Sequence, residues 1–65
     1  MLIAFKHIET KRYLANAWKG VADTTKMKED AKKWDITFSS RRRDLEMFKK
    51  NHEKELEHFE EIVIG

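Results

Sequence analysis

Apolar residues in the first third of the chain recur every three or four positions. Leu14, Ala17, Trp18 and Val21 follow this spacing, and the residues between them are mostly charged or polar. Because an α-helix completes a turn in about 3.6 residues, this spacing gathers the apolar side chains on one side of a helix. The pattern predicts a first amphipathic helix that begins near Thr10.

The following stretch predicts a second, shorter helix. Gly20 and the polar run at residues 23–25 favour a break followed by a helix N-cap, because Asp and Thr side chains accept hydrogen bonds from the free N–H groups of a first turn. Met27, Ala31 and Trp34 then return at helical spacing. We expect these three side chains to share one face of the second helix.

The longest apolar pattern lies in the C-terminal half. Residues 35–40 mix β-branched and cap-forming residues, which is typical of a turn between helices. From residue 41 onward the positions that step by three or four are Leu45, Phe48, His52, Leu56, Phe59 and Val63. This spacing predicts one continuous third helix, capped by Ser39 or Ser40, with a narrow apolar edge.

Together these patterns predict an all-α fold, a small three-helix domain in which a short helix pair packs against one long C-terminal amphipathic helix. Residues 1–65 would form a single domain. An alternative pairs residues 2–5 with residues 62–64 as two short strands, because both segments are rich in apolar or β-branched residues and are bounded by polar ones.

Length and composition limit the kind of protein this can be. A chain of 65 residues has a thin core, near the size at which burial barely offsets chain entropy. It has no cysteine, which excludes disulfides and thiolate metal sites. The apolar segment 1–8 is interrupted by Lys6 and His7 and lacks the features of a signal peptide or membrane span. We expect a cytoplasmic protein that does not associate with membranes.

The charges are unevenly distributed. Charged residues make up 40% of the chain, but the formal net charge is only +2. Up to residue 50 there are 13 Lys and Arg against 7 Asp and Glu, and beyond it 1 Lys against 5 Glu. A basic half suits phosphate or an acidic protein, and an acidic end can repel nucleic acid or pair with basic residues of a second helix. The same charges would also serve solubility alone.

The sequence offers little that could carry catalysis. Ser39 and Ser40 lack a Gly-rich turn that would position a nucleophile, and no phosphate-cradling loop is present. Glu55 and His58 have the E-x-x-H spacing of helical metal sites, but such a site needs further carboxylates from other helices. We expect a protein that is not an enzyme and that uses no metal, cofactor or small-molecule substrate.

The two tryptophans allow two interpretations. Aromatic side chains next to lysines can stack on the bases of single-stranded nucleic acid. However, Trp18 and Trp34 each fall on an apolar stripe of a predicted helix, and two tryptophans would supply much of the core of so short a chain. We therefore expect both side chains to be buried.

The strongest signal for a binding function is the run of Arg41, Arg42 and Arg43 where the third helix is expected to begin. A helix amino terminus favours anions, so three cations there call for compensation by an external anion such as phosphate or by neighbouring acidic residues. Lys49 and Lys50 extend the basic surface further along the helix.

A local motif bears on the same region. In residues 29–45 the small Ala31 is followed by the apolar Trp34 and Ile36 around a predicted turn, and then by residues 40–45, which open the next helix. This arrangement resembles the helix-turn-helix of bacterial transcriptional repressors, especially the winged type of sugar-catabolism repressors. The resemblance implies binding to double-stranded DNA. It places these residues at phosphates and base edges: Thr37, Ser39, Ser40, Arg42 and Arg43.

Two functions from different classes fit these observations. In the first, a regulatory or adaptor protein of the kind encoded by small accessory and phage-like genes binds a larger protein, or a second copy of itself, through the apolar helical face and can act as an inhibitor. Its anchors would be Leu45, Phe48, Leu56 and Phe59. In the second, a dimeric helix-turn-helix-like regulator binds DNA through Thr37, Ser39, Ser40, Arg41, Arg42, Arg43, Lys49 and Lys50.

Overall fold

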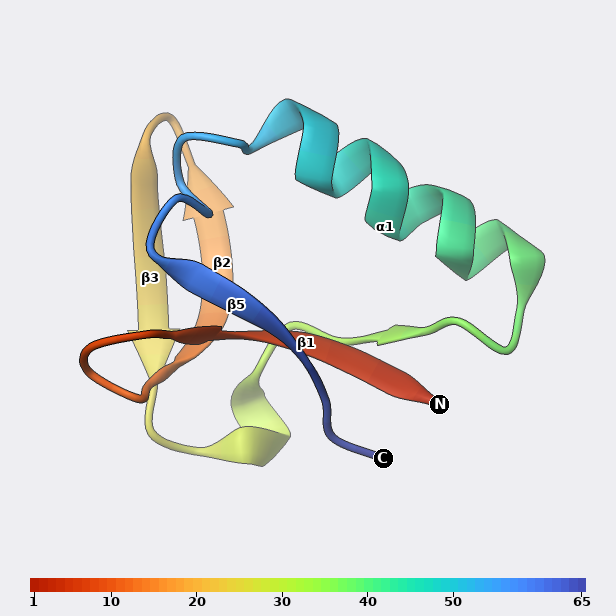
Figure 1. The fold of residues 1–65 in the computed structure, drawn as a ribbon, viewed down its shortest axis with the longest axis horizontal. Coiled ribbons are helices and arrows are strands. Elements are labelled where there is room, and N and C mark those ends of the chain that lie inside the picture. The colour runs from red at the N-terminus through yellow and green to blue at the C-terminus, as the bar shows by residue number, and fades with distance from the viewer.

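The computed structural model describes residues 1–65 and is dominated by strands (Figure 1). Five strands form one sheet, accompanied by one α-helix and one turn of 3₁₀ helix. In chain order the elements are β1 (Leu2–His7), β2 (Tyr13–Trp18), β3 (Val21–Thr25), η1 (Lys28–Asp30), β4 (Trp34–Asp35), α1 (Ser39–Asn51) and β5 (Phe59–Val63). The predicted all-α bundle of three helices is therefore wrong.

Strand β1 lies at the centre of the sheet, and every strand pair is antiparallel. It pairs with β5 from Ile3 to His7. Since β5 occupies one edge of β1 along this length, β2 and β4 share the other edge, β2 next to Lys6 and β4 next to Leu2 and Ile3. Strand β3 extends the sheet beyond β2.

The pairing of β1 with β5 confirms the alternative in which the two terminal segments are strands. Ala4 faces Ile62 and Lys6 faces Glu60 across the ladder, so apolar residues meet each other and opposite charges meet each other. Beyond the strand itself, the Leu2 N–H donates to the Gly65 carbonyl at 2.7 Å. The ladder therefore brings the two ends of the chain close together (Figure 1).

A hairpin replaces the predicted first helix. Strands β2 and β3 pair from Tyr13 opposite Thr25 to Trp18 opposite Val21, and two residues connect them. These are Lys19, with φ of 46°, and Gly20, with φ of 83°. Positive φ at both central positions is the geometry of the tight hairpin turns whose twist matches that of the strands. Glycine at the second position makes this turn accessible to the chain.

A β-bulge in β2 determines which side chains of the hairpin face the core. Leu14 pairs with Thr24, but the next pair is Asn16 with Asp23, so Ala15 is the extra residue. Strict alternation from the buried Leu14 would place Trp18 on the same face. The bulge shifts the alternation by one residue and sends each later side chain of β2 to the opposite face. Ala17 consequently faces inward, and Trp18 faces outward.

The predicted second helix is also absent. Residues 28–30 form only η1, and Trp34 lies in β4, where it pairs with Ile3. Figure 1 shows η1 on the opposite side of β1 from α1. Since residues 29–45 contain a single α-helix, they do not form a helix-turn-helix.

The third predicted helix is correct only in its first half. Helix α1 ends at Asn51, turns follow, and the chain then enters β5. The strand is favoured there because it covers the free edge of β1, which would otherwise leave backbone groups unpaired. Helix α1 is also shorter than the length required to cross a lipid bilayer.

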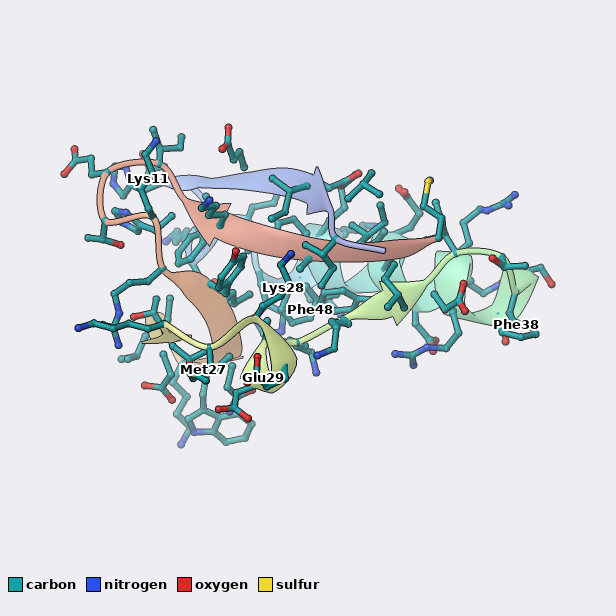
Figure 2. All side chains as sticks on the ribbon, turned by 90° about the horizontal axis from the view of Figure 1, so that it is seen from below. Lys11, Met27, Lys28, Glu29, Phe38 and Phe48 are labelled. Carbon is teal, nitrogen blue, oxygen red and sulfur yellow. The ribbon has the colours of Figure 1, made fainter.

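The core lies between the sheet and α1. Five buried side chains form it: Ile3, Phe5, Leu14, Trp34 and Leu45. The side chains that pack against this group with partial burial are Ala22, Ile36, Phe48, Leu56 and Phe59. Figure 2 shows Phe48 near the middle of the molecule, whereas Phe38 lies at its end, beside the start of α1.

Candidate functional site

The four predicted protein-binding anchors lie together, but at the core. Leu45 is buried within it, and Phe48, Leu56 and Phe59 pack against it. Side chains that fill the core of so small a domain are not free to dock onto a partner. A binding surface would therefore lie elsewhere on the molecule.

The arginines at the start of α1 are exposed, and two of them have partners within the chain. The Arg41 guanidinium donates to the Asp44 carboxylate at 3.1 Å and to the Lys33 carbonyl at 3.1 Å. The Arg42 guanidinium donates to the Ile36 carbonyl at 3.1 Å. Arg43 makes no such contact. The cationic first turn is thus stabilised in part by acceptors of the protein itself.

The other residues predicted to contact DNA differ in their environments. The Lys49 ammonium lies 3.0 Å from a Glu61 carboxylate oxygen, and this hydrogen bond raises the pKa of Lys49. Thr37 accepts a hydrogen bond from the amino terminus at 3.0 Å. Ser39, Ser40 and Lys50 are exposed. Lys49 therefore ties α1 to β5.

The outward-facing side of the hairpin carries an exposed apolar pair, Trp18 and Val21, that the sequence patterns did not predict. We call this side the outer hairpin face, and its residues are Tyr13, Asn16, Trp18, Val21, Asp23 and Thr25, which are direct pairs across β2 and β3. Trp18 is 66% exposed and its partner Val21 is 60% exposed. The Lys19 ammonium lies 5.6 Å from the centroid of the Trp18 ring.

The two tryptophans therefore have different environments. Trp34 is 3% exposed, as predicted, whereas the expected burial of Trp18 is wrong. The signal that could have located the hairpin is Gly20, which lies two positions after Trp18 and directly before Val21. A glycine between two apolar residues is compatible with a tight turn, and such a turn places its flanking residues opposite each other on one face.

On its inner side the hairpin is joined to the segment that follows α1. The Gly20 N–H donates to a Glu55 carboxylate oxygen at 3.0 Å, and the His52 ring lies 3.4 Å from the same oxygen. The backbone N–H of Glu55 and that of Gly20 stabilise the carboxylate and lower the pKa of Glu55. This contact holds the turn of the hairpin against residues 52–58.

Acid is expected to release this contact. Because the hydrogen bonds favour the charged carboxylate, the folded-state pKa of Glu55 lies below the ordinary value of 4.5, and the contribution to stability is lost as pH falls through that lowered pKa. We expect the Gly20 amide resonance to titrate with a midpoint below pH 4.5. In a Glu55→Gln control the titration should disappear, whereas a midpoint at or above 4.5 would contradict the contact.

The E-x-x-H pair does not form a metal centre. Glu55 is engaged by Gly20 and His52, whereas the ring of His58 lies 6.2 Å from that of His7. No group of three or more His, Asp and Glu side chains is placed to share an ion.

Comparison of the chain with protein-family models, with curated proteins and with solved structures gives no match.

Proposed function

We propose that the protein is a small non-enzymatic binding protein that docks onto a larger protein through the outer hairpin face, with Trp18 as its anchor. The single observation that carries this proposal is the 66% exposure of Trp18 in a chain whose other tryptophan is buried. This proposal keeps the adaptor function expected from the sequence, but it places the binding surface on the outer hairpin face and not on the helix.

Trp18 leaves a large apolar area in contact with water. A tryptophan side chain can bury on the order of 200 Å², which at about 25 cal/mol per Å² makes roughly 3 kcal/mol available from the exposed two-thirds. Burial of the Trp18 side chain in so small a core would add to the stability of the fold. A partner that covers Trp18 recovers this free energy, and tryptophan is among the residues most enriched at the energetic centres of protein interfaces.

The hairpin also presents Trp18 in a fixed position. The tight turn and the five residue pairs between β2 and β3 hold the backbone on both sides of the side chain. The Glu55 contact to Gly20 anchors the turn from behind. Preorganisation of this kind lowers the entropy cost of binding. Bulges often redirect a side chain toward a functional surface, which is what the bulge at Ala15 does here.

The proposal is tested by comparing three baits. The wild-type protein, Trp18→Ala and Met47→Ala are immobilised, and the proteins retained from untreated and from nuclease-treated lysate are quantified. Met47 is the matched control because it is a large apolar residue, 56% exposed, on α1. We expect at least one protein that wild type and Met47→Ala retain equally and that Trp18→Ala retains at least about tenfold less.

Three outcomes of that comparison would contradict the proposal. One is equal retention of every captured protein by all three baits. A second is capture that disappears on nuclease treatment, which would indicate nucleic acid as the ligand. A third is selective loss with Met47→Ala, which would place the docking surface on α1.

A further inference from the structure

A cavity lies on the inner side of the hairpin, behind the outer hairpin face. It has a volume of about 370 Å³ and is open to solvent. Its walls come from the loop that follows β1, from β3 and from the segment after α1, and only two of its ten lining residues are hydrophobic. We call it the hairpin cavity. Volumes of this size are typical of sites that hold small molecules.

Arg12 is the most unusual residue of this cavity. Its side chain is half-buried, and its guanidinium donates through Nε to the Thr24 hydroxyl at 3.0 Å and through Nη2 to the Thr24 carbonyl at 3.4 Å. No carboxylate lies within ion-pair distance of it. Charged groups removed from water are normally paired with an opposite charge. The structure thus holds an oriented cation that lacks a counter-ion.

Further donors line the same cavity as Arg12. His7 Nδ1 accepts hydrogen bonds from the backbone N–H groups of Glu9 and Thr10, both at 3.2 Å, so the proton of the neutral ring resides on Nε2. Lys54 and His58 also line the cavity, and neither side chain has a hydrogen-bond partner in the chain. All of these side chains can donate to an anion.

The one carboxylate in the cavity wall is already engaged. One oxygen of Glu55, Oε1, accepts a hydrogen bond from the Gly20 N–H at 3.0 Å and lies 3.4 Å from His52 Nδ1. The cavity wall therefore carries two cations, Arg12 and Lys54, and one anion, Glu55. His7 and His58 add hydrogen-bond donors. The balance favours an anionic ligand.

We infer that the hairpin cavity binds the phosphate group of a small phosphorylated molecule, with Arg12 as the principal contact. The planar guanidinium matches the oxygens of phosphate, and a preorganised arginine loses little freedom on binding. Lys54 and His58 close the site from the segment after α1, and the half-buried Phe59 supplies an apolar wall for the organic part of the ligand. The site is on the opposite side of the hairpin from Trp18, so it is independent of the proposed protein interface.

The test is a titration of the ¹⁵N-labelled protein followed by NMR at constant ionic strength. The probes are inorganic phosphate and a nucleoside monophosphate, with chloride as the reference anion. We expect saturable shifts for both phosphates, centred on the Gly20 and Thr24 amides, which border the cavity. Equal dissociation constants would identify free phosphate as sufficient, and tighter binding of the monophosphate would show that the organic part also contacts the wall.

Variants decide whether the shifts arise from this site. Arg12→Gln is expected to raise the dissociation constant for phosphate about tenfold or more, which is the loss of one charge-assisted interaction. Should that variant fail to fold, Lys54→Ala and His58→Ala remove exposed side chains and should each weaken binding severalfold. Lys26→Ala, which removes an exposed lysine outside the cavity, should change nothing. The inference would be overturned if chloride caused the same amide shifts as phosphate. It would also be overturned if none of the cavity variants changed the dissociation constant for phosphate.

Discussion

Replacement of Trp34 by alanine is expected to leave the protein largely unfolded at room temperature. The Trp34 ring meets Phe5 edge-on, with 5.6 Å between centroids, and lies 4.7 Å from the centroid of Phe48. Truncation of a buried tryptophan to alanine costs about 3–5 kcal/mol. The core of a domain below 70 residues rarely supplies more than about 3–5 kcal/mol of net stability, so the loss is comparable with the whole.

Circular dichroism and urea unfolding measure this effect, and Trp18→Ala is the matched control. It removes the same side chain from a position that is 66% exposed, so it should change the free energy of unfolding by less than about 1 kcal/mol. A folded Trp34→Ala variant, or equal destabilisation by the two substitutions, would contradict the core that the structure describes.

The second large effect concerns β5. Backbone N–H groups of alternate strand residues point to the same neighbour, and the Ile64 N–H donates to the Leu2 carbonyl of β1 at 2.9 Å. The Ile62 N–H therefore also points to β1. Ile62→Pro removes this donor and is expected to cost about 2–3 kcal/mol. Val63→Pro affects an N–H on the free edge of the sheet, where proline is tolerated, and should cost less than about 1 kcal/mol.

A helix in this segment would respond differently, because proline inside a helix costs about 3 kcal/mol at either position. Urea unfolding of the two proline variants distinguishes the alternatives, and Ile62→Ala accounts for the lost side chain. A similar loss of stability in Ile62→Pro and Val63→Pro would show that β5 is not an edge strand.

The hairpin explains why the first half of the chain looks helical. Leu14 and Ala17 both face inward although they lie three positions apart, because the bulge adds one residue between them. Trp18 and Val21 share the outer face because a two-residue turn lies between them. These two irregularities reproduce helical spacing with strands. The spacing of apolar residues in the sequence fits either a helix or a bulged hairpin, and the spacing alone does not indicate the bulge.

The second half was partly predictable. The sequence predicts a continuous helix from residue 41 to Val63 that is capped by Ser39 or Ser40. The observed helix runs from Ser39 to Asn51 with Phe38 at its N-cap, so only its first half is correct. Leu45, Phe48, Leu56 and Phe59 do belong to one apolar cluster. Local spacing could not show that Phe59 lies in a strand, because that depends on its pairing with His7, which is distant in the sequence. Only the β-branched character of residues 62–64 indicated the strand, and it supported the alternative that proved correct.

The candidate sites were less predictable because they depend on contacts across the fold. The link between Gly20 and Glu55 spans 35 positions, and the hairpin cavity gathers residues from both ends of the chain. The arginine run at residues 41–43 is visible in the sequence because its residues are adjacent. The unusual property of Arg12, its lack of an acidic neighbour, exists only in the folded chain.

The most direct test of the account is the accessibility of each tryptophan to a neutral quencher. Trp34→Phe leaves only Trp18 as an emitter, and Trp18→Phe leaves only Trp34. We expect acrylamide to quench Trp18 strongly, with red-shifted emission, and to quench Trp34 weakly, since the two side chains are 66% and 3% exposed. Equal shielding of both tryptophans in the folded variants would mean that the bulge does not turn Trp18 outward, and the proposed docking surface would then not exist.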